Sequence, residues 1–151
     1  MLKLILNKKY NPLFSSEARY FIITGGRGSG KSFAVTVFLT LLTMTKGIRI
    51  LFTRYTMTSA HLSIIPEFLE KIGLLGFDDV FSINKAEVVN TSNQSDILFR
   101  GIKTSAGNQT GNLKSLQGIS TWVLDEAEEL VDENIFDTID LSIREKGIQN
   151  R

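Results

Sequence analysis

The sequence predicts an α/β domain with a mostly parallel sheet, flanking helices and an inserted β-hairpin. Residues 20–24, Tyr-Phe-Ile-Ile-Thr, form an unbroken run of β-branched and aromatic side chains, which is typical of a strand buried on both faces. A glycine-rich stretch and an apolar helical pattern follow, and residues 48–53 then form a second apolar strand. A strand, a helix and a strand in this order predict a parallel pair joined by a right-handed crossover.

Both helices expected in the first half end at glycines. The first spans residues 32–46 and is followed by Gly47, a residue type that readily adopts the left-handed conformation found after helix ends. The second follows the apolar positions within 62–72, with Pro66 near its first turn and Gly73 at its end. The first helix is apolar on nearly every side, so we expect it to be mostly buried.

An antiparallel hairpin is expected next, at the edge of the sheet. Residues 86–91 and 96–100 read as its two strands, and the polar residues 92–95 between them read as its turn. Residues 104–112 are almost wholly Ser, Thr, Asn, Gln and Gly, which predicts a mobile surface loop.

A third strand and a third helix complete the expected domain. Residues 121–125 form another apolar run, with Trp122 expected in the core, and they end in a carboxylate. Residues 132–146 show an amphipathic helical pattern that ends at Gly147.

Composition and charge exclude several classes of protein. The chain has 151 residues, 42% of them hydrophobic, and no cysteine, which excludes a disulfide scaffold and a thiolate metal site. The apolar run at the N-terminus is short and interrupted by Lys3, so a signal peptide or membrane span is not expected, and we predict a cytosolic protein. Residues 1–75 hold 10 basic and 3 acidic side chains, and residues 76–151 hold 7 and 13. This asymmetry is compatible with an anionic partner and a cation, or with solvated faces alone.

A glycine-rich loop between the first strand and the first helix predicts phosphate binding. It satisfies G-x-x-x-x-G-K-[ST] in the strand–loop–helix context that this motif requires. The glycines let successive N–H groups point toward phosphate oxygens, and the helix dipole favours their charge. We expect Lys31 at the β- and γ-phosphates and the Ser32 hydroxyl on Mg²⁺; the alternative is a glycine-rich turn with a chance Lys-Ser pair. The loop residues are Gly25, Gly26, Arg27, Gly28, Ser29, Gly30, Lys31 and Ser32.

Two carboxylates at the end of the third strand predict the other half of the site. Asp125 lies where ligands bind in open α/β sheets, so it is a candidate to hold Mg²⁺ directly or through water. Glu126 is then a candidate general base for an attacking water. The alternative interpretation is that this Asp-Glu pair only begins a helix.

Two arginines are secondary candidates. Arg27, within the glycine-rich loop, could stabilise charge on the transferred phosphate as an arginine finger does, or could be an ordinary surface residue. Arg54, just past the second strand, could bind phosphate or a DNA backbone, or could be a solvated strand end.

Five segments, in this order, resemble the large terminase subunit of tailed bacteriophages. The resemblance covers nearly the whole chain, and Lys-Ser-Leu-Gln-Gly followed by Asp-Glu-Ala-Glu-Glu-Leu is its most specific part. The segments are Gly25-Gly-Arg-Gly-Ser-Gly-Lys-Ser32, Phe52-Thr-Arg54, Ile97-Leu-Phe-Arg-Gly101, Leu113-Lys-Ser-Leu-Gln-Gly-Ile119 and Trp122-Val-Leu-Asp-Glu-Ala-Glu-Glu-Leu130.

This resemblance implies an additional-strand P-loop NTPase that hydrolyses ATP to ADP and phosphate and drives double-stranded DNA into a preformed capsid. By the same resemblance, Lys31 and Ser32 bind the phosphates and Mg²⁺. Asp125 is the Walker B aspartate, Glu126 the catalytic glutamate and Arg27 the candidate finger. Residues 10–14 fall where such proteins contact adenine.

The family resemblance also implies partners and a location. The expected partners are double-stranded DNA, a small terminase subunit, the portal or procapsid, and further copies of the chain in a ring, with no membrane. The expected location is the cytoplasm of an infected or lysogenic bacterial host.

Large terminases continue past this region with another strand and a nuclease domain, whereas this sequence stops at Arg151. In the family's sheet that strand lies between the first strand and the strand ending in Asp125. We therefore expect residues 1–151 to be a P-loop ATPase domain that is incomplete at its C-terminus. Two alternatives are another DNA-stimulated P-loop ATPase of helicase type and a nucleotide-binding fragment that does not hydrolyse ATP.

Overall fold

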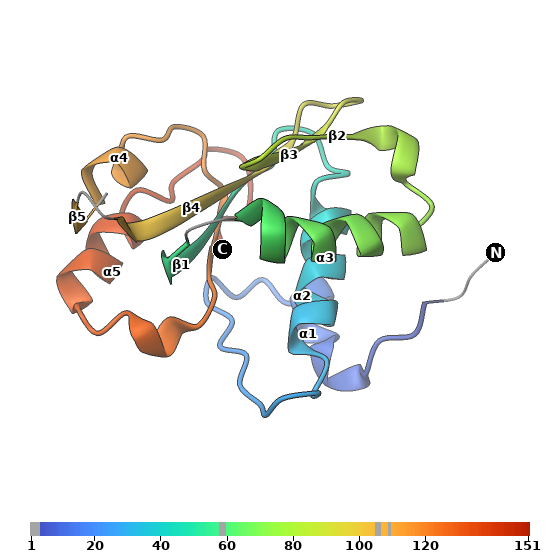
Figure 1. The fold of residues 1–151 in the computed structure, drawn as a ribbon, viewed down its shortest axis with the longest axis horizontal. Helices are drawn as coiled ribbons and strands as arrows, with labels where there is room; N and C mark the ends of the chain where they lie inside the picture. The colour runs from blue at the N-terminus through green and yellow to red at the C-terminus, as the bar shows by residue number, and fades with distance from the viewer. Residues whose placement is uncertain (1–3, 58–59, 105–106, 109) are drawn as a thin grey trace.

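One mixed sheet organises the chain in its computed structural model, which describes residues 4–57, 60–104, 107–108 and 110–151 (Figure 1). Its main path runs β2-β3-β4-β1-β6, and β5 pairs with β4. The pairs β1–β4 and β1–β6 are parallel, and the pairs made by β2, β3 and β5 are antiparallel. The strands are β1 (Arg49–Thr56), β2 (Phe81–Ile83), β3 (Glu87–Asn90), β4 (Asp96–Thr104), β5 (Gly107–Asn108) and β6 (Thr121–Leu124).

The α/β class is confirmed, but the expected mostly parallel sheet is wrong because the hairpin enters the sheet. Strands β3 and β4 do pair as an antiparallel hairpin. However, β4 lies beside β1 in the interior of the sheet rather than at its edge. The physical reason is that Ile97, Leu98 and Phe99 are all buried, which requires apolar contacts on both faces of the strand.

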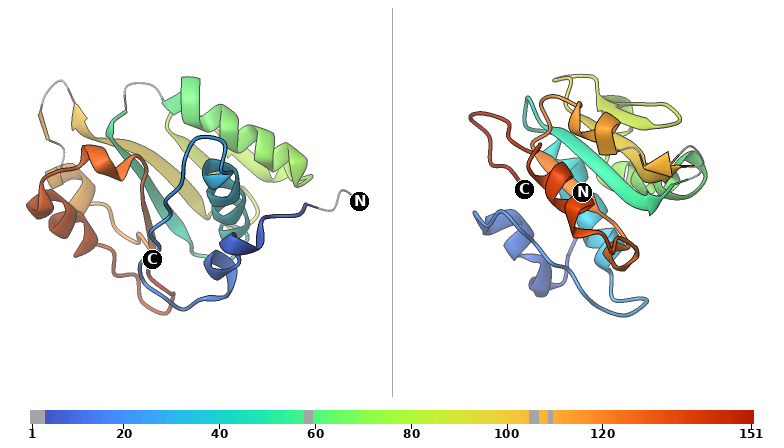
Figure 2. Two further views of the ribbon diagram at one scale, coloured as in Figure 1. Left: turned by 90° about the horizontal axis from the view of Figure 1, so that it is seen from below. Right: turned by 90° about the vertical axis from the view of Figure 1, so that its left-hand side faces the viewer.

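Helices cover both faces of the sheet (Figures 1 and 2). On one face, Ile50 and Phe52 of β1 pack into a large cluster with the helices α2 (Lys31–Leu42) and α3 (Ala60–Leu74). On the other face, Leu51 packs into a smaller cluster with α4 (Thr110–Lys114) and α5 (Glu133–Asp140). The short helices are η1 (Lys8–Tyr10), α1 (Pro12–Ser15), η2 (Asp78–Val80) and η3 (Ala127–Glu129).

Three phenylalanines fix α3 on the sheet. Phe52, Phe68 and Phe99 come from β1, α3 and β4, and their ring centroids lie 5.3–5.9 Å apart in edge-on or tilted arrangements. Such pairs contribute about 0.5–1.5 kcal/mol each beyond the area that they bury. The three rings thus link helix α3 to the parallel strands β1 and β4.

Residues 20–24 do not form the predicted strand. They are extended but belong to no strand of the sheet; Phe21 and Ile23 pack against the core, whereas Tyr20 is 58% and Ile22 90% exposed. The predicted strand–helix–strand unit is therefore wrong as well. An apolar run favours an extended backbone, but membership of a sheet also requires a neighbour with free N–H and C=O groups.

The edge of β6 is bonded to another part of the chain instead. The Arg151 N–H donates to the Ser120 carbonyl at 2.9 Å, and the Trp122 N–H donates to the Arg151 carbonyl at 2.8 Å. The indole Nε1–H of Trp122 donates to Thr53 Oγ1 at 2.9 Å, and its ring lies 5.1 Å from that of Phe136. Trp122 is thus packed between strand β1 and helix α5.

Several predicted element ends are displaced. Helix α2 ends at Leu42, before the predicted end at 46, and α3 runs past Gly73 and contains Pro66 in its interior. The helix predicted at 132–146 is shorter in the structure, where α5 ends at Asp140. Ile143 lies beyond the end of this helix and is still buried. The stretch predicted as a loop at 104–112 includes β5 and the start of α4, and positions 105–106 and 109 lie outside the described residues.

Asp96 and Arg49 form a charged pair at the amino end of the parallel strands. Arg49 Nε donates to both carboxylate oxygens at 3.2 and 3.0 Å, and its side chain is 42% exposed while that of Asp96 is 8% exposed. Burial raises the pKa of Asp96 above its usual value, although Arg49 and its hydrogen bonds oppose the shift.

Replacing Arg49 with Met is expected to lower the free energy of unfolding at neutral pH by about 2 kcal/mol, because a buried carboxylate loses its partner. Loss of the guanidinium raises the pKa of Asp96 further, so the folded variant takes up a proton more readily than the unfolded chain. The loss in the free energy of unfolding is therefore largest above the pKa of Asp96 in the folded variant, and it shrinks as the pH falls through that pKa. Urea unfolding measured from neutral pH downward, as far as both proteins stay folded, checks this prediction, and a stability loss that does not change with pH would contradict it.

Among the described residues, no helix combines the length and the apolar character that crossing a bilayer requires.

Candidate nucleotide site

The glycine-rich loop leads into helix α2, as the motif requires, whereas the strand expected before the loop is not formed. Gly30 is the residue before the helix and has φ +79°, and Gly28 has φ +77°, a region that favours glycine over other residue types. The first main-chain bond of the helix runs from the Ala34 N–H to the Gly30 carbonyl at 3.0 Å. A loop in this conformation leads directly into a helix N-terminus, where N–H groups and the helix dipole favour an anion.

Lys31 is folded back over this loop. Its ammonium contacts the Gly25 carbonyl, lies 3.2 Å from the Gly26 carbonyl and 3.5 Å from Ser29 Oγ, so its charge is held within the curve of the loop. Ser32 is exposed in the first turn of α2. Arg27 is exposed in the loop, and no carboxylate of the described residues forms an ion pair with it.

Tyr10 anchors the loop from a distant part of the chain. It is 5% exposed, and its hydroxyl donates to the Ser29 carbonyl at 2.9 Å. The sequence placed residues 10–14 near adenine only by resemblance, and this contact with the loop was not predicted. A tyrosine nineteen positions before its partner gives no local signal, because only the tertiary packing of η1 brings the two together.

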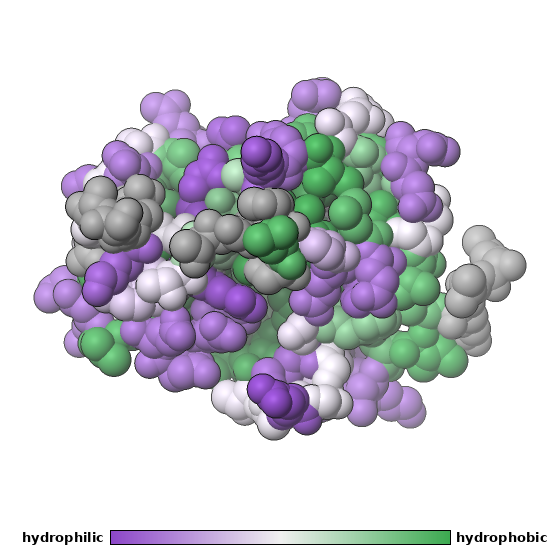
Figure 3. All heavy atoms as spheres, viewed as in Figure 1, coloured by the Kyte–Doolittle hydropathy of each residue, from purple (hydrophilic) through white to green (hydrophobic). Residues whose placement is uncertain are grey.

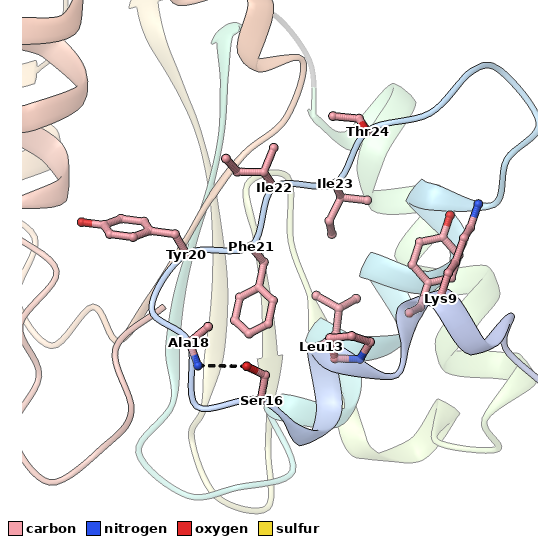
Figure 4. A pocket seen from close by; sticks show the side chains of 11 residues that line it. Lys9, Leu13, Ser16, Ala18, Tyr20, Phe21, Ile22, Ile23 and Thr24 are labelled. Carbon is pink, nitrogen blue, oxygen red and sulfur yellow. Dashed lines mark hydrogen bonds between the residues drawn. The ribbon is translucent and has the colours of Figure 1, made fainter.

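A pocket of about 430 Å³ lies beside this anchor (Figure 4). It is lined by residues from η1, α1 and the extended segment 20–24, including Tyr10. Figure 4 shows Phe21 and Leu13 lying toward the space between helix α1 and segment 20–24, whereas Ile22 points away from that space. One wall of the pocket therefore belongs to the segment that leads into the glycine-rich loop.

Asp125 and Glu126 follow β6 at the carboxyl end of the parallel strands. The Asp125 N–H donates to the Thr53 carbonyl at 2.9 Å, which fixes its backbone to β1. Glu126 has φ +54° and ψ +49°, and its side chain is 49% exposed. A left-handed conformation at a residue other than glycine costs about 1–2 kcal/mol and is concentrated at functional sites.

Arg54 contacts both carboxylates. Its Nε and Nη2 both lie 2.7 Å from Asp125 Oδ2, and its Nε lies 3.9 Å from Glu126 Oε2. The sequence suggested a phosphate or DNA contact or a solvated strand end, and the structure instead places Arg54 against the acidic pair. The register that pairs Thr53 with Leu124 brings these side chains together, and no local pattern encodes that register.

The glycine-rich loop and the acidic pair lie on the same side of the molecule, along the lower edge in Figure 1, which faces the viewer in the left view of Figure 2. No hydrogen bond or ion pair joins the two groups among the described residues. Figure 3 shows hydrophilic side chains gathered over α5 and the turn before it. Exposed carboxylates of this region are Glu126, Glu128, Glu129, Asp132, Glu133 and Asp137.

Two of the predicted site residues carry oxygen atoms of the kind that Mg²⁺ prefers. The hydroxyl of Ser32 and the carboxylate of Asp125 are oxygen ligands of the kind that Mg²⁺ prefers. Mg²⁺ in such sites uses one or two protein ligands together with phosphates and water, rather than a protein cage. Among the described residues, no group of three or more His, Cys, Asp or Glu side chains could hold a metal ion.

Comparison with known proteins gives a consistent match over most of the chain. The family model described as phage terminase large subunit matches residues 17–151. A curated relative, the large terminase subunit of Bacillus phage SPP1, is 24% identical over an alignment of 150 residues that covers 89% of this chain and 34% of the relative. The chain thus spans about a third of the length of the relative that it matches.

Proposed function

We propose, from the premise that this chain belongs to the phage terminase large subunit family, that it is the ATP-binding and ATP-hydrolysing portion of a motor that moves double-stranded DNA into a procapsid. The observation that carries the proposal is the glycine-rich loop, with its left-handed Gly30 opening α2 and Lys31 folded over it. A second element, the acidic pair Asp125 and Glu126 at the carboxyl end of the parallel strands β1 and β6, supports it.

The residues divide the chemistry as follows in this proposal. Loop N–H groups and Lys31 bind the β- and γ-phosphates of ATP, and Ser32 and Asp125 hold Mg²⁺. Mg²⁺ supplies charge stabilisation for the transferred phosphate when it is bound. Glu126 accepts a proton from the attacking water, and Arg27, exposed in the loop, is the candidate to stabilise the developing charge.

The loop then corresponds to a Walker A motif and Asp125 to the Walker B aspartate of a P-loop ATPase domain. We extend the proposal to the partners that the family implies: double-stranded DNA, a small terminase subunit, the portal or procapsid, and other copies of the chain in a ring. The work would take place in the cytoplasm of the host bacterium.

Phosphate release from ATP by the full chain tests the proposal. We expect Mg²⁺-dependent turnover that EDTA abolishes and that linear double-stranded DNA raises several-fold, while single-stranded DNA of the same length has less effect. Stimulation by single-stranded DNA alone would favour a helicase-type ATPase. ATP binding without phosphate release would instead identify a nucleotide-binding protein that does not hydrolyse ATP.

A further inference from the structure

Arg54 is the cation paired with the acidic residues after β6, among the residues that the structure describes. It lies near the carboxyl end of β1, and the residue before it, Thr53, accepts the main-chain hydrogen bond of Asp125. Two parallel strands therefore fix the backbones of both partners. Their ion pair is part of the sheet geometry rather than a chance contact of two surface side chains.

Both guanidinium contacts fall on one carboxylate oxygen. Nε and Nη2 of Arg54 each lie 2.7 Å from Asp125 Oδ2, and these contacts leave Oδ1 of Asp125 out of the pair. Glu126 lies within Coulomb range, with Nε to Oε2 at 3.9 Å. The side chains of Arg54 and Asp125 are 28% and 36% exposed, so solvent screens their charges only in part.

A divalent cation at Asp125 would meet this guanidinium at short range. The resident positive charge offsets the two carboxylates and repels a second cation, which weakens binding of a metal ion on its own. Nucleotide phosphates bring negative charge that compensates for the repulsion. The same site can therefore accept a cation together with phosphates while it disfavours the cation alone.

We propose that Arg54 is a resident counter-ion that keeps free divalent cations from Asp125 and Glu126 and makes metal binding at this pair conditional on nucleotide phosphates. The inference rests on the proposed function, because it takes Asp125 to be the metal ligand of the nucleotide site.

Binding of Mn²⁺ alone, without nucleotide, measures this property directly through the electron paramagnetic resonance signal of free Mn²⁺. Compared with the wild type, we expect Arg54→Gln to bind one Mn²⁺ about tenfold more tightly, which corresponds to about 1.4 kcal/mol. Arg54→Lys keeps the charge and is expected to stay near the wild type. Adding Asp125→Asn to Arg54→Gln should remove the gain.

The matched control is Arg49→Gln. It breaks the ion pair between Arg49 and Asp96, and Arg49 lies on the same strand as Arg54, at the opposite end of β1. The variant therefore tests the loss of a structural ion pair away from the site. It should lower stability and leave Mn²⁺ binding unchanged. If Arg54→Gln does not fold, as judged by circular dichroism, Arg54→Met removes the charge while keeping an unbranched apolar stem and is compared in its place.

Unchanged or weaker Mn²⁺ binding in the charge-removing variant would overturn the proposal and assign Arg54 to holding Asp125 in place. A gain shared by Arg49→Gln would overturn it too. If wild-type ATP turnover is present and the Mn²⁺ gain is absent, only this inference fails. If the gain depends on Asp125 but the chain neither binds nor hydrolyses ATP, the proposed function fails and the cation-excluding role of Arg54 remains.

Discussion

Replacing Glu126 with Gln is expected to lower ATP turnover by about 1,000-fold, within the range that a lost general base costs. Glutamine keeps the length and shape of the side chain but cannot accept a proton from water. The side chain is 49% exposed and lies 3.9 Å from Arg54, so the substitution removes little packing. ATP affinity should therefore stay within about twofold of the wild type, because the lost interaction belongs to the transition state.

Steady-state phosphate release, with equilibrium binding of a fluorescent ATP analogue in parallel, separates these two effects. Glu129→Gln is the matched control, because Glu129 is an exposed carboxylate in the adjoining η3 turn that has no role in the proposed chemistry. Its turnover should equal that of the wild type. Full turnover by Glu126→Gln would remove Glu126 from the proposed mechanism.

Replacing Lys31 with Ala is expected to weaken ATP binding by about 100-fold, which corresponds to about 2.7 kcal/mol for charge-assisted hydrogen bonds to phosphate. The ammonium lies against the Gly26 carbonyl and Ser29 Oγ, so it is held within the curve of the loop. Turnover should be lost together with affinity, which distinguishes this variant from Glu126→Gln.

Isothermal titration with a non-hydrolysable ATP analogue and Mg²⁺ measures the loss. Lys46→Ala is the control, because it removes a lysine that is exposed beyond the other end of α2. Circular dichroism should show both variants folded, since the ammonium of Lys31 bonds to atoms of its own loop. Wild-type affinity in Lys31→Ala would contradict the assignment of the loop to phosphate binding.

Local patterns predicted conformation better than they predicted neighbours. The helices α2 and α3 and the strands β1 and β6 follow from apolar periodicity and from glycine positions, and the structure contains all four. The run at 20–24 predicted a buried strand, and the structure contains no strand there. It could not show that the segment lies off the sheet, because pairing depends on which strand edges meet in the folded chain.

Consecutive apolar residues help to predict which strands lie in the interior of a sheet. The consecutive apolar residues Ile97, Leu98 and Phe99 indicate a strand covered on both faces, and this pattern fits the interior position of β4 better than the predicted edge. The shortened α5 has a different cause. Ile143 continues the four-residue spacing of Ile135 and Ile139 and is buried with them. The apolar spacing therefore indicated which residues are buried, but it did not show that the helix ends at Asp140.

In the candidate site, too, the sequence indicates local motifs but not the residues that contact them in the fold. The glycine-rich loop and the acidic pair are candidates because their residue types occur at a spacing that nucleotide chemistry requires, and their roles stay predictions. Arg54 and Tyr10 could not be predicted as partners of these groups. Their contacts depend on the parallel register of β1 with β6 and on the packing of η1 against the loop.

Trp122 gives the chain an intrinsic fluorescent reporter at this end of the sheet. It is the single tryptophan of the sequence, it is bonded to Thr53, and it precedes Asp125 on the same stretch of chain. Excitation at the red edge of protein absorbance therefore samples one known position without any attached dye. Emission intensity and wavelength can be read during titrations and during unfolding, so ligand binding and stability can be compared on a single optical signal.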